Sequence, residues 1–261
     1  MSDDAPDAPA PEPWSLDVLT LFPHWLDWMG EVRPIRNATE SGALALRALD
    51  MREHSPLKHR QVDDTPYGGG AGMVLRVDAV VAALEGHYEQ PLEQLRAKRR
   101  IVILTPAGRI FDDALAIEWA AEQRPTTILC GRYEGFDYRV HEHVATEEIS
   151  VGPYVLSGGE VAAMTIVDAL ARKLPGALGN EESLADETFS DALSGGSEYP
   201  HYTRPAEFRG WGVPEILSSG HHAQIGAWRL DQSAQRTIRQ APAGRPGPAA
   251  EPPNDTSGAN S

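Results

Sequence analysis

Short apolar runs recur along the chain, and those that are bounded by glycine or proline predict buried strands of a parallel sheet. The apolar runs are Trp14–Phe22, Gly42–Leu49, Ile101–Leu104, Thr126–Cys130 and Val151–Leu156. The last two lead directly into Gly131 and into Ser157-Gly158-Gly159. Glycine lets a ligand approach the backbone closely, and ligands of open α/β sheets bind at the carboxyl ends of the strands. We therefore predict that two buried strands end side by side in one pocket built mostly from backbone.

Helical spacing of apolar positions appears between these runs, so the fold class predicted is α/β. Strand–helix–strand order implies parallel pairing with right-handed crossovers. The predicted helices are His24–Gly30, Val77–Leu84, Asp112–Glu122, Val161–Lys173 and a segment from His222 onward. A segment with three consecutive glycines, Asp63–Met73, reads as a loop, either a flexible connection or a functional one. It lacks the lysine and hydroxyl of a P-loop, which argues against nucleotide triphosphate binding.

Changes in composition divide the chain into five parts. Residues 1–13 are acidic and proline-rich, and residues 241–261 are rich in proline, alanine and glycine, so both read as disordered tails. Residues 14–177 form the large α/β domain, and the acidic, serine- and glycine-rich residues 178–198 form a linker. Residues 199–240 then form a small helical domain.

The overall charge limits the kind of surface that could bind a polyanion. The formal net charge is −15, and removing the −4 of the first tail and the −1 of the last leaves −10 on the body. A nucleic-acid surface must therefore be a local basic patch whose binding weakens with salt. The single cysteine, Cys130, excludes an intramolecular disulfide, and the sequence shows neither a secretory signal nor an apolar run long enough to cross a bilayer. We expect a soluble, cytoplasmic protein.

The small domain carries the residues that such a patch would need. Arginines are interleaved with aromatic residues, a combination that contacts phosphates and stacks on bases. On composition alone, a small helical domain with solvated arginines is the more ordinary interpretation. The residues are Arg204, Arg209, Arg229, Arg236, Arg239, Tyr202, Trp211 and Trp228.

Seven motifs together resemble one family. They are TPYGGGAGM, LTPAGR, CGRYEGFDYRV, SVGPYVLSGGE, TIVDALARKLPGALGNEES, PHYTRP and SSGHHAQIGAWR, and the resemblance that they carry covers roughly Trp14 to Arg239. In this order and spacing they resemble the bacterial tRNA (guanine-N(1))-methyltransferases, which belong to the SPOUT superfamily. The resemblance implies a SPOUT-type parallel sheet with a C-terminal deep trefoil knot that holds S-adenosyl-L-methionine. It also implies a homodimer with its active site at the subunit interface, and a tRNA substrate with guanosine at position 37 preceded by guanosine.

The chemistry of such a transfer indicates which side chains to look for. S-adenosylmethionine brings its own electrophilic methyl group, so the protein must position the reactants and move a proton. Guanine N(1) is protonated at neutral pH, so a carboxylate base is expected, with an arginine to stabilise charge on the neighbouring carbonyl oxygen. The resemblance puts the arginine at Arg172, which spacing alone would equally explain as a cation at a helix C-terminus.

The sequence departs from the family at the residue that would act as the catalytic base. The family's aspartate stands in an Asp-Ser-Phe context, whereas this chain has Glu187-Thr188-Phe189 preceded by Asp186. Register favours Glu187, with Asp186 as the runner-up, and both would otherwise read as solvated linker acids. The departure keeps two alternatives open: a SPOUT methyltransferase that acts on another RNA position, and a non-catalytic RNA-binding relative.

Cofactor contacts follow from the matching motifs, and the backbone of Val151–Leu156 would read the adenine edge. Glu134 could pair with the cofactor's cationic portion, and Arg132 could position phosphate or substrate. We predict no metal site, since the nine histidines lack zinc spacing, although magnesium could act through the tRNA. The predicted cofactor residues are Pro106, Gly131, Tyr133, Glu134, Gly135, Val151, Gly152, Pro153, Tyr154, Val155, Leu156, Gly158 and Gly159.

Overall fold

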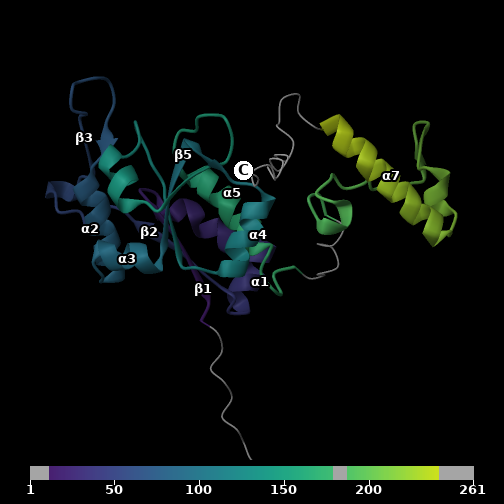
Figure 1. Cartoon of the computed structure of the whole chain (residues 1–261), viewed down its shortest axis with the longest axis horizontal. Coiled ribbons are helices and arrows are strands. Elements are labelled where there is room, and N and C mark those ends of the chain that lie inside the picture. Colours follow the sequence, from purple (N-terminus) through teal and green to yellow (C-terminus); the bar gives the residue numbers. More distant parts are fainter. Residues whose placement is uncertain (1–11, 179–186, 241–261) are drawn as a thin grey trace, which may run out of the picture. The chain divides into compact units, whose positions relative to one another are not determined.

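The computed structural model describes residues 12–178 and 187–240, and the chain divides between Gly179 and Asn180 into two compact units (Figure 1). The predicted C-terminal tail, most of the predicted N-terminal tail and residues 179–186 of the predicted linker lie outside the described residues.

The first unit is built on a five-stranded sheet in the order β2-β1-β6-β5-β7, and every neighbouring pair is parallel. This confirms the α/β class and the parallel pairing predicted from the strand–helix–strand order. β6 lies between β1 and β5, although it follows both in the chain. The strands are β1 Trp14–Thr20, β2 Leu44–Asp50, β5 Arg100–Ile110, β6 Thr126–Leu129 and β7 Glu147–Ser150.

Two hydrophobic clusters cover the two faces of this sheet, because alternate strand residues point to opposite sides. In β5, Val102 belongs to one cluster and Ile101 and Ile103 to the other. The 3₁₀ helix η1 (Pro23–Glu31) and the helices α1 (Arg33–Glu40), α4 (Asp113–Glu122) and α5 (Glu160–Ala171) contribute to the first cluster. The helices α2 (Val77–Tyr88) and α3 (Leu92–Lys98) and the π-helical turn η3 (Val140–Val144) contribute to the second.

One predicted strand is wrong. Val151–Leu156 is an irregular loop in which Val155 is 86% exposed, and the strand lies one segment earlier, at β7. β7 is an edge strand paired only with β5, so acidic residues are tolerated there, and Glu147 forms an ion pair with Arg100 at 2.7 Å. The apolar run that follows turns away at Gly152-Pro153, because proline has no N–H to donate to a ladder.

Other helices and strands differ from the prediction in their boundaries, for local reasons. β5 does not stop at Leu104: residues 105–108 leave the ladder, and pairing resumes at Arg109, which shares Ile149 as a partner with Leu104. The polar helices α1 and α3 were not predicted. α4 begins as predicted, because the Asp112 side chain accepts a hydrogen bond from the N–H of Leu115 at 3.0 Å.

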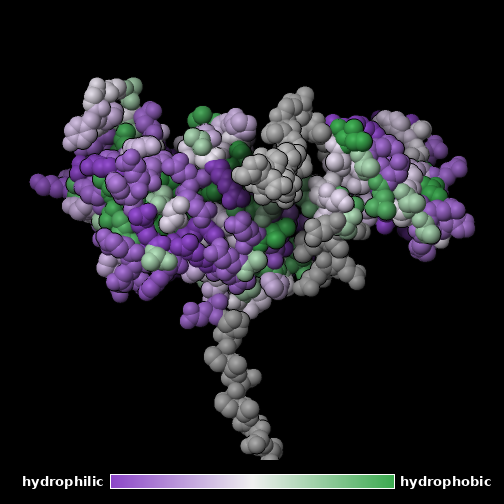
Figure 2. Space-filling model, viewed as in Figure 1, coloured by the Kyte–Doolittle hydropathy of each residue, from purple (hydrophilic) through white to green (hydrophobic). Residues whose placement is uncertain are grey.

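The second unit contains a short antiparallel pair, β8 (Glu207–Phe208) with β9 (Trp211–Gly212), and two single turns, η4 (Asp191–Leu193) and η5 (Glu215–Ser218). Its long helix, α7 (His222–Gln240), begins where predicted. Ser233 of α7 donates a hydrogen bond to the carbonyl of Ser197 at 2.6 Å, which fastens the irregular segment around Ser197 to the helix. Hydrophobic and hydrophilic residues are intermixed on the face of this unit that Figure 2 shows.

Candidate functional site

The two glycine turns that follow β6 and β7 meet directly. The N–H of Gly159 donates a hydrogen bond to the carbonyl of Gly131 at 3.0 Å. A Cβ added at Gly159 would lie 2.7 Å from Cα of Cys130, so only glycine permits this approach. The contact joins the end of β6 to the start of α5, as expected if the two turns build one pocket.

A cavity of about 240 Å³ opens beside this contact. The structure brings twelve of the thirteen predicted cofactor residues to its wall, while Pro153 does not line it. Residues that the sequence interpretation missed also line it, among them Phe136, His141 and Ser150. The first two lie in or just after the CGRYEGFDYRV motif, so proximity to that motif was the signal that could have found them.

The wall formed by the first turn is held in an unusual backbone conformation. Tyr133 has φ of +60° and Gly135 has φ of +101°, and the N–H of Gly135 donates to the carbonyl of Arg132 at 3.0 Å. A non-glycine residue at positive φ is uncommon and tends to occur at functional sites. The Tyr133 side chain is 55% exposed at the cavity rather than packed in the core.

An ion pair lies beneath the second turn. Glu160 is 1% exposed, approaches the Arg132 guanidinium at 2.9 Å, and accepts a hydrogen bond from the Thr20 hydroxyl at 2.8 Å. Arg132 also lies over the rings of Phe22 and Trp25, at 4.7 and 4.8 Å from their centroids. A Cβ at Gly158 would overlap the Arg132 side chain. These contacts of Arg132 are internal and brace the glycine turn, and its predicted contact with phosphate stays a prediction.

The triple-glycine loop is anchored next to this wall. Glu134 donates its N–H to Met73, and Leu75 donates to Gly135, at 3.0 and 2.9 Å. A Cβ at Gly72 would lie 2.5 Å from the Glu134 carboxylate, so the loop backbone packs against that side chain. At its base, β3 (Asp63–Asp64) pairs with β4 (Val74–Leu75). The loop thus packs against Glu134, which lines the cavity, while its Tyr67 is fully exposed.

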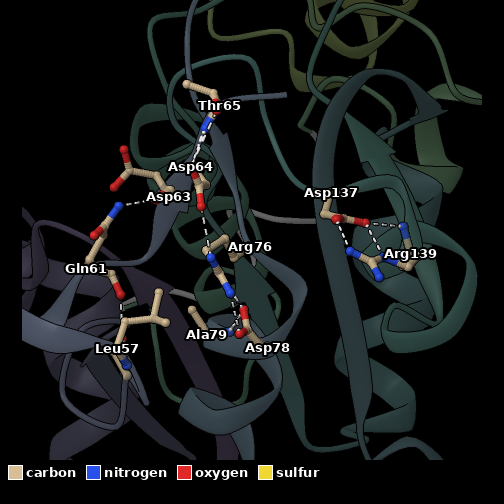
Figure 3. Close-up of polar contacts among 11 residues, drawn as sticks. Leu57, Gln61, Asp63, Asp64, Thr65, Arg76, Asp78, Ala79, Asp137 and Arg139 are labelled. Atoms are coloured by element: carbon tan, nitrogen blue, oxygen red, sulfur yellow. Dashed lines mark hydrogen bonds and ion pairs between the residues drawn. The ribbon is translucent and has the colours of Figure 1, made fainter. Parts of the chain in front are cut away.

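Three ion pairs fix the base of the loop and the segment beyond the first turn (Figure 3). Arg76 bridges Asp64 and Asp78 at 2.9 and 2.8 Å, and Arg139 pairs with Asp137 at 2.6 Å. Hydrogen bonds from these arginines lower the pKa of the Asp78 and Asp137 carboxyl groups below the usual range. Both carboxylates therefore stay ionised at neutral pH and maintain their ion pairs with Arg76 and Arg139.

The candidate catalytic residues lie in different parts of the chain. Arg172 follows the last turn of α5 in the first unit, where its N–H bonds to the carbonyl of Asp168 at 3.3 Å. Glu187 belongs to the second unit and is partly buried, and Asp186 lies outside the described residues. The structure therefore brings Arg172 to the end of the helix that starts at the second glycine turn, and it leaves the meeting of Arg172 with either acid as a prediction.

Comparison with known proteins identifies the family to which this arrangement belongs. A sequence model of the family described as "tRNA (Guanine-1)-methyltransferase TrmD" matches residues 14–243. This chain belongs to that family. Proteins named tRNA (guanine-N(1)-)-methyltransferase are similar over most of their length. The one from Dehalococcoides mccartyi strain CBDB1 is 45% identical over 227 residues, which cover 87% of this chain and 88% of the relative.

Two further family members are similar to this chain to about the same extent. The protein of the same name from Geobacter metallireducens is 46% identical over 226 residues, with 87% of this chain and 89% of the relative covered. The one from Listeria monocytogenes serotype 4a is 43% identical over 227 residues, with 87% and 90% covered. The resemblance read from the seven motifs is confirmed. Among the described residues, no helix is long and apolar enough to cross a membrane.

Proposed function

We propose that the protein is an S-adenosyl-L-methionine-dependent tRNA (guanine(37)-N(1))-methyltransferase whose substrates are tRNAs with guanosine at position 36. Family membership supports methylation of guanine N(1) in tRNA. The observation that carries the site assignment is the hydrogen bond between Gly159 and Gly131, because it joins the two motif turns around a single cavity.

The residues around the cavity fit the proposed methyl donor. Tyr154, Val155 and Leu156 are apolar yet 53%, 86% and 40% exposed beside the cavity, so they offer faces for a flat aromatic base. Backbone groups of the same loop can hydrogen-bond the edge of that base, and the Glu134 carboxylate can attract a cationic group. When bound, the donor supplies an electrophilic methyl group.

The chain's own task is then to move a proton and to stabilise charge. Guanine N(1) becomes a good nucleophile as its proton leaves, and Glu187, or Asp186 beside it, would accept that proton. Arg172 would donate hydrogen bonds to the guanine carbonyl oxygen, where negative charge builds during the transfer. Because the arginine and the acids belong to different units, a productive geometry requires the second unit to present its acid to the α5 end of a first unit.

The second unit supplies groups suited to tRNA. Trp211 and Phe208 are 71% and 52% exposed, and the Arg209 guanidinium lies 5.1 Å from the Phe208 ring centroid. An exposed aromatic pair beside a cation can stack on a base and contact a phosphate, so a local patch can bind RNA despite the acidic body.

Assembly and location complete the proposal. Exposed Trp28 and Val161, at 54% and 57%, belong to η1 and α5 of the first unit and support a self-association surface. We include in the proposal a homodimer with the active site at the subunit interface, a cytoplasmic location, and a deep trefoil knot through which β6, β7 and their turns enclose the donor.

Radiolabelled methyl transfer to unmodified tRNA transcripts tests the proposal. Transfer is expected to a transcript with guanosines at positions 36 and 37, and it should be lost when either is replaced. Transfer that persists without guanosine 37 would assign the enzyme to another RNA position. Donor binding or tRNA binding with no transfer to any transcript would instead favour the non-catalytic relative.

A further inference from the structure

A cluster of two histidines and a glutamate lies away from the cavity. Glu53 and His54 follow the end of β2, and His87 lies in the last turn of α2. Their three potential ligand atoms all lie within 4.8 Å of one another. None of the three residues lines the cavity between the glycine turns. We propose that Glu53, His54 and His87 bind a Zn²⁺ ion, with water in the remaining coordination position.

The orientation of His87 supports this assignment. Its Nε2 lies 3.0 Å from the backbone carbonyl of Asp50, and a carbonyl can only accept, so Nε2 carries the hydrogen. In the neutral ring Nδ1 is then unprotonated and can accept, and Oε2 of Glu53 lies 3.9 Å from it. A metal-binding histidine typically donates its other N–H to a carbonyl or carboxylate in this way. The His87 side chain is only 10% exposed, so this orientation is held by its surroundings.

The backbone makes room for the second histidine. Gly86 occupies the last turn of α2, where glycine costs about 1 kcal/mol relative to alanine. A Cβ at this position would overlap the ring of His54. The rings of His54 and His87 consequently meet edge to face, with their centroids 4.6 Å apart. Gly86 therefore permits the two imidazoles to approach each other.

The ligand set and spacing favour zinc over magnesium. Imidazole nitrogen suits Zn²⁺, whereas Mg²⁺ prefers oxygen ligands and retains water. Zinc–ligand bonds of about 2.1 Å in a tetrahedron place ligand atoms roughly 3.4 Å apart. The 3.9 Å between His87 and Glu53 is close to that value, and the 58% exposed Glu53 side chain can close the difference by rotating.

Bound zinc would tie the segment after β2 to the end of α2. That segment leads through His59 and Arg60, which have φ of +58° and +55°, into β3 at the base of the triple-glycine loop. A cross-link at its start would limit its motion. The consequence is structural and does not depend on the reaction that the enzyme performs.

Isothermal titration with ZnCl₂ tests the proposal on the full chain, after chelator treatment and without a histidine tag. We expect one ion per chain, a rise in melting temperature, and visible absorption bands when Co²⁺ replaces Zn²⁺. His87→Asn and Glu53→Gln should each weaken zinc binding at least tenfold, since even loss of a supporting partner weakens metal sites by about 10–100-fold. Glu53 is exposed, so Glu53→Gln keeps the test valid should His87→Asn fail to fold.

A matched control uses another exposed histidine–glutamate pair of the chain. His143 and Glu142 lie 3.8 Å apart and are 71% and 52% exposed. His143→Asn and Glu142→Gln should leave zinc affinity unchanged. Equal zinc affinity in wild type and Glu53→Gln, or an equal loss in the control variants, would overturn the proposal, and Glu53 and His87 would then form a surface ion pair only.

Discussion

The close contact between the two glycine turns makes Gly159→Ala a sharp perturbation. The new Cβ would lie 2.7 Å from Cα of Cys130 and 3.2 Å from the backbone N of Gly131. Carbon atoms in contact normally lie about 3.5–4.0 Å apart, so the turns must separate by roughly 1 Å. Neither neighbour is the end of a flexible side chain, and the backbone itself has to move.

The expected loss of stability follows from two terms. Overpacking a well-packed site costs about 1–3 kcal/mol, and a stretched hydrogen bond between Gly159 and Gly131 costs about 1 kcal/mol more. Together they give about 2–4 kcal/mol, which corresponds to a melting temperature lower by about 4–16 °C for a chain of this size. Because the same two turns line the cavity, affinity for the methyl donor should fall as well.

The single cysteine provides a direct assay for separation of the turns. Burial raises the pKa of the Cys130 thiol well above its usual range, so the thiol stays protonated and unreactive at pH 8 in the folded protein. Thiol-reagent kinetics, urea unfolding and donor titration should be measured for Gly159→Ala. Gly30→Ala is the matched control, because a Cβ at Gly30 has no atom within 4 Å.

We expect faster Cys130 labelling, lower stability and weaker donor binding in Gly159→Ala, with Gly30→Ala close to wild type. The reasoning would be refuted by a Gly159→Ala protein that matches wild type in unfolding free energy and in donor affinity. A Gly159→Ala protein that loses stability but keeps full donor affinity would support the close packing of the two turns. It would count against the cavity as the donor site.

Three further predictions concern the reaction and the brace beneath it. Arg172→Ala should reduce turnover by about 10²–10³-fold while calorimetry shows unchanged donor affinity, because its hydrogen bonds form in the transition state. Glu187→Gln should reduce methyl transfer by about 10²–10⁴-fold and Asp186→Asn much less; full activity in both variants would exclude this segment as the source of the base. Glu160→Gln should destabilise the protein by about 3 kcal/mol in urea unfolding, because Arg132 loses its buried partner, and an Arg132→Met/Glu160→Gln double variant should recover part of the loss.

Much of the sheet was predictable because its inner strands are apolar and bounded by turn residues. β6 and the start of β5 are nearly continuous apolar runs, as expected of strands buried on both faces. β7 was not predictable in this way, because an edge strand with Glu147 and Glu148 lacks that pattern. The more apolar run beside it, Val151–Leu156, is instead an exposed loop at the cavity, so hydrophobicity alone does not identify a strand there.

The candidate site was predicted from motifs more than from periodicity. Glycine-ended strands indicated a pocket built from backbone, and the hydrogen bond between Gly159 and Gly131 agrees with that interpretation. The ion pair of Arg132 with Glu160 could not be foreseen, because it joins residues 28 positions apart through a fold that pattern alone does not specify. The cluster of His54 with Glu53 and His87 was not predictable for the same reason, because His87 lies far from the other two residues in the sequence.

The position of β6 in the sheet affects the order in which the protein can form during synthesis. β1 pairs with β2 early, but β6 must enter between β1 and β5, so the middle of the sheet stays open until about residue 129 has left the ribosome. Pairings between distant parts of a chain form slowly. The nascent chain therefore exposes the inner edges of β1 and β5 for a period, and the cavity between the glycine turns, which also needs the turn after β7, is among the last parts of the first unit to assemble.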